Sequence, residues 1–164
     1  MIITTSRKPS QRTRSLVNDL ARVFNFEILN RGKIPLSELI ENKDDMIIVE
    51  ELKGNPGRLK IFNFENNKIL SMNLSLKLQR EVSGKVFKNS GKLSSKFDKN
   101  TENLKELFFE YLFKKLSNYE EESSDVVLNF KTVDESTFYI EVHKDSENLG
   151  PSLKIKTVKI LDIE

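Results

Sequence analysis

The alternation of hydrophobic and polar residues is clearest in the middle of the chain. Every second residue from 70 to 78 is apolar (Leu70, Met72, Leu74, Leu76 and Leu78), and the residues between them are polar. A period of two is typical of a strand with one face in the core and one exposed. Shorter apolar runs predict strands at 2–5, 26–29, 46–49 and 58–64. The run 46–49 is apolar throughout, so it is expected to be covered on both faces, and Asn55-Pro56-Gly57 predicts a turn after it.

Helical spacing predicts three helices. The first runs from Ser10, a suitable N-cap, to about Phe24, with its apolar residues on one face. A short helix is predicted at 36–41, after Pro35. A longer one is predicted at 101–117, where apolar residues cover well over half of the circumference. Such a helix is normally buried from more than one side, so we expect it to lie between layers.

The remaining apolar runs complete a mixed α/β pattern. Strands are predicted near 126–130, 138–142 and 153–161. In the last of these the apolar set changes phase from Leu153 and Ile155 to Val158 and Ile160, which predicts a β-bulge near Thr157. Residues 80–99 are rich in Lys, Ser and Gly and are expected to form a mobile loop. This loop would divide one compact domain into a first half (about 1–80) and a second half (about 100–164).

Charge is segregated along the chain although the net charge is only +2. Residues 1–33 contain seven basic and two acidic residues, and residues 77–99 contain the same numbers, so each segment carries +5. Two basic segments on an otherwise acidic chain predict a preferred side for a polyanion. No apolar run approaches the roughly 20 residues of a membrane span, and basic residues follow closely on Met1. We therefore expect a cytoplasmic protein without a membrane partner.

The sequence offers no support for catalysis. It contains no Cys and one His, and no phosphate-binding loop, dinucleotide fingerprint or nucleophile elbow is present. Asp44 and Asp45 are more simply turn residues than a metal pair, and His143 has no identifiable base or orienting partner. We predict no catalytic residue, metal, cofactor or small-molecule substrate.

The first turn of the first predicted helix is unusual because it carries Arg12 and Arg14. Acidic residues are expected there, and cations cost roughly a few tenths of a kcal/mol each. A phosphate at the helix N-terminus would reverse this sign, because it could accept from free backbone N–H groups and flanking guanidinium groups together. Ordinary solvated surface charge is an equal alternative. The lysines of 80–99 could contact an RNA backbone or could simply keep a loop soluble.

The order and spacing of several short motifs resemble the Brix-domain family. The motifs are the segment 3–10 (ITTSRKPS) with Arg12 and Arg14, then Asn30-Arg31-Gly32, the strand 45–49, the turn 54–57 and the alternating strand that ends near Leu78. The second half resembles the family more loosely. Gly150-Pro151 matches, but relatives usually have Arg where this chain has Ser152, and His143 stands without the Arg that often accompanies it.

The resemblance implies ribosome biogenesis through binding to precursor ribosomal RNA and to ribosomal or other assembly proteins. It implies that residues 1–164 form a single Brix domain of two similar halves, each a mixed sheet with packed helices like the anticodon-binding domain of class IIa aminoacyl-tRNA synthetases. The small, extension-free form is similar to the archaeal branch, closest to the small-subunit-processing type.

Two groups of residues are the expected RNA contacts. The leading phosphate contacts are Arg7, Lys8, Arg12, Arg14, Arg31 and Lys33, and the auxiliary ones are Lys85, Lys88 and Lys92. A second hypothesis is a protein-interaction scaffold inside a pre-ribosomal particle, motivated by residues 100–164, which hold eight basic and fourteen acidic residues. A third, an RNA-processing nuclease using Asp44 or Asp45, is disfavoured.

Overall fold

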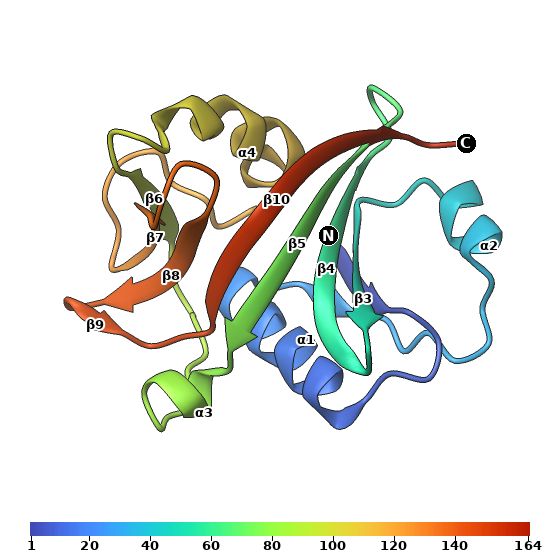
Figure 1. Cartoon of the computed structure of the whole chain (residues 1–164), viewed down its shortest axis with the longest axis horizontal. Helices are drawn as coiled ribbons and strands as arrows, with labels where there is room; N and C mark the ends of the chain where they lie inside the picture. Colours follow the sequence, from blue (N-terminus) through green and yellow to red (C-terminus); the bar gives the residue numbers. More distant parts are fainter.

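The computed structural model describes residues 1–164, which form one mixed sheet with helices packed against it (Figure 1). The strands are β1 (Ile2–Thr5), β2 (Glu27–Ile28), β3 (Met46–Leu52), β4 (Asn55–Asn63), β5 (Lys68–Lys77), β6 (Leu93–Phe97), β7 (Val126–Thr132), β8 (Phe138–Lys144), β9 (Glu147–Asn148) and β10 (Ser152–Asp162). The helices are α1 (Gln11–Phe24), α2 (Leu36–Glu41), α3 (Gln79–Val82) and α4 (Lys105–Tyr111), with the 3₁₀ turns η1 (Glu102–Leu104) and η2 (Phe113–Lys115). The predicted mixed α/β class is confirmed.

The two halves of the sheet repeat one topology. In the first half, β1 leads through α1, β2 and α2 to β3, which is parallel to β1, and β4 and β5 follow as an antiparallel meander. In the second half, β6 leads through α4 to β7, which is parallel to β6, and β8 and β10 follow antiparallel. The antiparallel pair β5 and β10 joins the halves, so the order is β2-β1-β3-β4-β5-β10-β8-β7-β6. The likeness to anticodon-binding domains stays a prediction.

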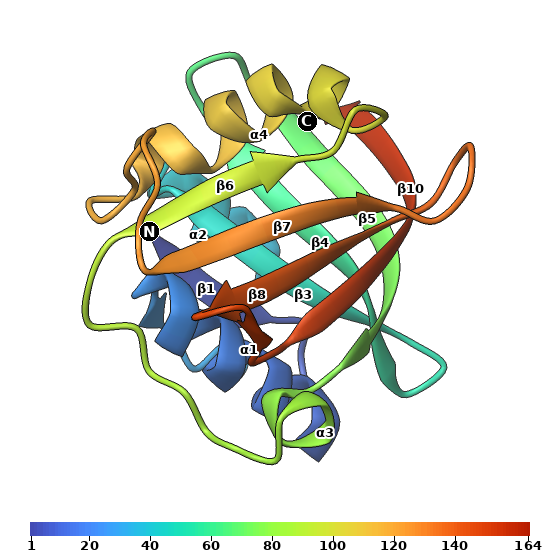
Figure 2. The same cartoon turned by 90° about the vertical axis from the view of Figure 1, so that its left-hand side faces the viewer.

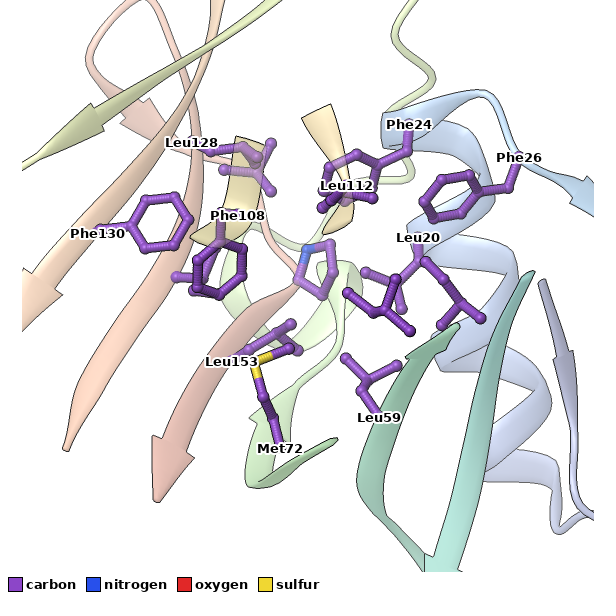
Figure 3. Close-up of a pocket in the computed structure, with 15 residues that line it drawn as sticks. Leu20, Phe24, Phe26, Leu59, Met72, Phe108, Leu112, Leu128, Phe130 and Leu153 are labelled. Atoms are coloured by element: carbon purple, nitrogen blue, oxygen red, sulfur yellow. The ribbon is translucent and has the colours of Figure 1, made fainter. Parts of the chain in front are cut away.

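One hydrophobic core belongs to both halves. Most of its 28 buried residues come from α1, α4 and the strands, and Figure 2 shows α4 at the top and α1 at the bottom of the view, with strands between them. Where the halves meet, side chains such as Leu59, Met72, Phe130 and Leu153 surround a void of about 40 Å³ (Figure 3). Almost all of the lining is hydrophobic. A void this small and apolar is a packing gap between the halves, not a ligand site.

Several local predictions are confirmed. Ser10 caps α1 by accepting a hydrogen bond from the backbone N–H of Thr13. The continuously apolar segment of β3 is buried on both faces, because Ile47 packs in the main core and Ile48 packs in a second cluster under Leu39 of α2. The pairing of β5 with β10 shifts register between Ile155 and Thr157, which is the predicted bulge.

Three local predictions are wrong. Residues 80–99 do not form one loop, because they include most of α3 and the strand β6, which lies parallel to β7 with Leu93 fully buried. The helix expected at 101–117 is interrupted at Leu112 (φ −128°, ψ −63°). Phe108, Tyr111, Leu112 and Phe113 are buried, whereas Phe109 remains 37% exposed. The chain reverses at Lys53 and Gly54, whose φ angles are positive, so Asn55-Pro56-Gly57 already belongs to β4.

Candidate nucleic-acid interface

A basic groove lies between the end of β1, the first turns of α1 and the segment that follows β2. Its volume is about 580 Å³, and it is lined by Thr5, Lys8, Pro9, Arg14, Val17, Asn18, Ile28, Leu29, Asn30, Arg31, Gly32 and Lys33. Four of these residues are cations and none is an acid. We call this feature the basic groove. It gathers Lys8, Arg14, Arg31 and Lys33, which are four of the six leading phosphate contacts expected from the sequence.

Arg31 is the buried member of the basic groove, with 9% of its surface exposed. Its Nη1 donates to the carbonyl oxygen of Thr5 (2.9 Å), and its Nε donates to that of Ile34 (2.7 Å). Burial lowers the pKa of Arg31, the positive charge of Arg7 lowers it further, and Glu50 acts in the opposite direction. No carboxylate lies within ion-pair distance of this guanidinium. Arg31 therefore braces β1 and also leaves a partly desolvated charge without a counter-ion.

The other cations around the basic groove are exposed. Lys8, Arg14 and Lys33 line it, and Arg7 is close enough to influence Arg31. None of the four forms an ion pair within the protein. Their charges remain available to an anion.

A carboxylate of the protein lies at the N-terminus of α1, where the sequence analysis expected a phosphate, and the phosphate site there stays a prediction. The carboxylate of Glu51, from β3, already occupies that position. It accepts hydrogen bonds from the backbone N–H of Ser10 (3.2 Å) and from Oγ1 of Thr13 (2.8 Å). Burial raises the pKa of Glu51, but these hydrogen bonds outweigh burial and the net pKa is lowered. On α1, the cation that lines the basic groove is Arg14, from the first turn after this cap.

Arg12 does not line the basic groove. Its guanidinium pairs with Glu81 of α3 (Nη2 to Oε1, 3.0 Å) and donates to the carbonyl oxygen of Leu76 at the end of β5 (3.2 Å). The hydrogen bond from Arg12 is the largest cause of the lowered pKa of Glu81. Both side chains of the pair are about one-third exposed. Arg12 thus fastens α1 to α3, and the structure separates it from Arg14.

The auxiliary lysines lie in another place. The connection 83–92 crosses the C-terminal end of α1, where the backbone N–H of Asn89 donates to the backbone carbonyl oxygen of Arg22 (3.0 Å). Lys85 pairs with Glu147 of β9 at 3.0 Å, whereas Lys88 and Lys92 are exposed and unpaired. The connection that carries these lysines therefore lies at the C-terminal end of α1, away from the basic groove at its first turns.

Two of the residues considered for catalysis have ordinary partners. Asp45 pairs with Lys115 (2.9 Å), and His143 lies 3.0 Å from Glu141. No group of three or more His, Cys, Asp or Glu residues is placed to hold a metal ion. None of the helices combines the length and the apolar character that crossing a membrane demands.

The sequence analysis missed two polar groups of the basic groove, Asn18 and Asn30. Asn18 had a usable signal, because it follows Arg14 by four residues on a helix and so shares its face. Asn30 was noted only as part of a turn. Their amides add hydrogen-bonding capacity between the cations.

Comparison with known proteins identifies relatives among the archaea, although no family model matches the chain. A protein of Methanococcus maripaludis described as "probable Brix domain-containing ribosomal biogenesis protein" is 92% identical over 164 residues, which is 100% of both chains. A protein of the same description from Archaeoglobus fulgidus is 37% identical over 91 residues, covering 53% of this chain and 59% of that protein.

Solved structures agree on the fold. A ribosomal biogenesis protein described as probable, from Aeropyrum pernix, superposes with a TM-score of 0.72 at 23% identity, covering 95% of this chain and 94% of that one. The archaeal Imp4-like protein Mil superposes with a TM-score of 0.68 at 26% identity, covering 98% and 99%. The architecture is thus that of archaeal ribosome biogenesis proteins. The chain belongs to the Brix domain-containing ribosomal biogenesis proteins.

Proposed function

We propose that the protein binds precursor ribosomal RNA through the basic groove and assists rRNA processing and subunit assembly in the cytoplasm without catalysing a reaction. The observation that carries the proposal is the gathering of four cations in a groove that no carboxylate lines. One of the four, Arg31, is desolvated and lacks an acidic partner. A phosphate would supply the missing charge.

The chemistry of the basic groove suits a sugar-phosphate backbone. Arginine offers a planar fork of donors that matches phosphate oxygens, and lysine adds a flexible point charge. Arg14 and Arg31 supply the forks, Lys8 and Lys33 the point charges, and Arg7 lies near Arg31. Arg12 and Lys85 are engaged with glutamates, so we assign them a smaller share, and Lys88 and Lys92 stay auxiliary.

Residues 1–164 would act as a single Brix domain that meets RNA with its first half. The second half is acidic, with eight basic and fourteen acidic residues in 100–164. This net charge favours contacts of the second half with basic assembly or ribosomal proteins. A scaffold that holds only proteins is the alternative function, and the RNA-binding experiment separates the two.

The test removes the exposed charges of the basic groove and leaves the buried one in place. The groove variant combines Lys8→Gln, Arg14→Gln and Lys33→Gln, and Arg31 is kept because it braces β1. The control variant combines Lys96→Gln, Lys99→Gln and Lys105→Gln, three exposed and unpaired lysines from β6 to α4 in the second half. Binding to a labelled fragment of precursor ribosomal RNA is measured by fluorescence anisotropy over a series of salt concentrations.

We expect the groove variant to bind roughly 30-fold more weakly at low salt, with a log–log salt slope smaller by about 2 to 3. The control variant has the same net charge and should lose less than threefold. Equal losses of RNA affinity in both variants would show that binding depends on overall charge and not on the basic groove. Absence of RNA binding by the unmodified protein at low salt would favour the protein scaffold.

A further inference from the structure

The outer face of the sheet at the junction of the halves carries lysines that have no partner. Residues of β5 alternate between the core (Leu70, Met72, Leu74) and this face (Ser71, Asn73, Ser75, Lys77). On the neighbouring β10, Leu153 and Ile155 point into the core, so Lys154 points outward beside Ser75. Figure 1 shows β5 and β10 side by side through the middle of the molecule.

The β-bulge in β10 keeps the lysines on this face along the strand. Strict alternation from Leu153 would place Lys159 inside and Val158 outside. The extra residue at the bulge reverses the phase, so Val158 pairs with Met72 and packs against the core. Lys159 then pairs with the outward Ser71. A bulge moves the side chains of a strand to the opposite faces, and here it places Lys154 and Lys159 on the same face.

Three cations of this surface, Lys77, Lys154 and Lys159, form no ion pair in the protein. Lys77 pairs in register with Ser152, two residues from Lys154, so these two lysines lie on a diagonal of roughly 8 Å. Lys154 and Lys159 are separated by roughly 13 Å along β10. We call these three residues, with the hydroxyl and amide groups between them, the sheet-face lysine patch.

The acids near this patch are already neutralised. A groove of about 430 Å³ is lined by Lys77 and Lys154 together with Glu81 and Glu141. Glu81 pairs with Arg12, and Glu141 pairs with Lys131 at 3.2 Å. The cations of β4 behave differently from the patch, because both of them pair with one glutamate on β3. Unpaired positive charge is therefore present on this face where the halves join.

We infer that the sheet-face lysine patch is a second RNA-binding surface, for the backbone of a double-stranded segment. The inference rests on the proposed RNA-binding function and adds the class of RNA structure. Surfaces that hold single strands stack bases on aromatic side chains, and Tyr139 is the one aromatic residue that lines the groove of the patch. Duplex RNA presents phosphates and 2′-hydroxyls with its bases inside. Lysines suit the phosphates, and the side chains of Ser75 and Tyr139 suit the hydroxyls.

The patch is tested with a variant that combines Lys77→Gln, Lys154→Gln and Lys159→Gln, beside the control variant in Lys96, Lys99 and Lys105. The probes are a labelled RNA hairpin with a stem of about 16 base pairs and a labelled single strand of the same length without self-complementarity. All substitutions are of partly or fully exposed lysines, and unchanged thermal unfolding confirms that the variants fold.

We expect the patch variant to bind the hairpin roughly 30-fold more weakly at low salt, with a salt slope smaller by about 2 to 3. Its affinity for the single strand, and both affinities of the control variant, should change less than threefold. Equal losses for hairpin and single strand would overturn the assignment to duplex RNA, and unchanged hairpin binding would overturn the surface as an RNA contact. If the groove variant loses RNA and the patch variant does not, only this inference fails. If the unmodified protein binds neither RNA, the proposed function fails with it.

Discussion

The connection from β1 to α1 and the connection from β6 to α4 occupy the same place in the two halves, yet their charge differs. In the first half the stabilising acid is Glu51 on the neighbouring strand β3, and the connection supplies donors from Ser10. In the second half the acid is Asp98 in the connection itself, and the donors come from Thr132 on the neighbouring strand β7. The same bridge is built with donor and acceptor exchanged.

This exchange leaves only one of the two connections cationic. Because Glu51 lies on a strand, the first connection is left with Arg7 and Lys8 and no acid of its own. Because Asp98 lies in the second connection, its charge offsets that of Lys99. A repeated topology thus fixes where a bridge is needed, and the position of one carboxylate decides which connection stays cationic.

The largest expected effect concerns the hydrophobic core that the two halves share. Phe130 is 1% exposed, and its ring centroid lies 4.1 Å from that of Phe97 and 4.9 Å from that of Phe108. Phe130→Ala should lower the free energy of unfolding by roughly 3–5 kcal/mol, measured by urea denaturation. Since the core is common, hydrogen exchange should show β3 and β7 losing protection together. Loss of protection confined to β6–β8 would mean that the two halves unfold independently of each other.

The next effect concerns the hydrogen-bonded Asp98 of the second half and is measured by acid titration. Hydrogen bonds, first from the backbone of Thr132 and then from Thr132 and Thr101 side chains, lower the pKa of Asp98 from 3.8 to about 2, against the opposing effect of burial. A lowered pKa in the folded state gives stability that is present above pH 4 and is lost as the pH falls towards 2. Asp98→Asn should therefore lower Tm at neutral pH and flatten its decline between pH 4 and 2. A parallel decline in variant and parent would contradict the assignment.

A smaller effect tests the anion site without RNA. Inorganic phosphate that binds the folded basic groove should stabilise it by about 1.4 kcal/mol at ten times its Kd. For a domain of this size that raises Tm by roughly 3–6 °C. Phosphate also stabilises proteins generally by exclusion from their surface, so the measured quantity is the rise in Tm of the parent minus that of the groove variant in Lys8, Arg14 and Lys33. A difference of zero would show that the groove does not hold phosphate.

The smallest effects distinguish neighbouring arginines on α1. Arg12→Gln breaks a pair whose side chains are 35% and 39% exposed, so stability should fall by at most about 1 kcal/mol. Its RNA affinity should stay within twofold. Arg14→Gln should leave Tm unchanged and weaken RNA binding roughly threefold. The opposite ranking in anisotropy titrations would move the RNA site from the basic groove to the face near α3.

The sequence predicted the elements whose signals are local. The cap at Ser10, the alternation along β5 and the phase change in β10 each involve residues within a few positions of one another. Those patterns follow from the periods of helix and strand, and all three were confirmed. Strand β6 escaped because, between Leu93 and Phe97, it is polar and is recognisable only by its pairing with β7.

The sequence was enough to name the basic residues of the candidate site, but not to tell which of them are engaged by acids within the protein. The basic residues near the N-terminus were evident, but Arg12 finds its glutamate 69 residues away and Glu51 reaches the helix from 38 residues beyond Thr13. Pairs so far apart along the chain produce no periodic pattern in the sequence from which they could be predicted. The lysine patch escaped for the same reason, because only the register of β5 with β10 brings Lys77 beside Lys154.

The pairing of β5 with β10 has a consequence for how the protein is made. Lys77 pairs with Ser152, which lies 75 residues further along the chain, so this edge of β5 is covered only after β10 has been synthesised. Until then a nascent chain presents an open strand edge, which is a template for association with other chains. Contacts of such long sequence separation also slow folding. We expect a fragment ending before β10 to associate during synthesis, so that the sheet becomes safe only when both halves have left the translating ribosome.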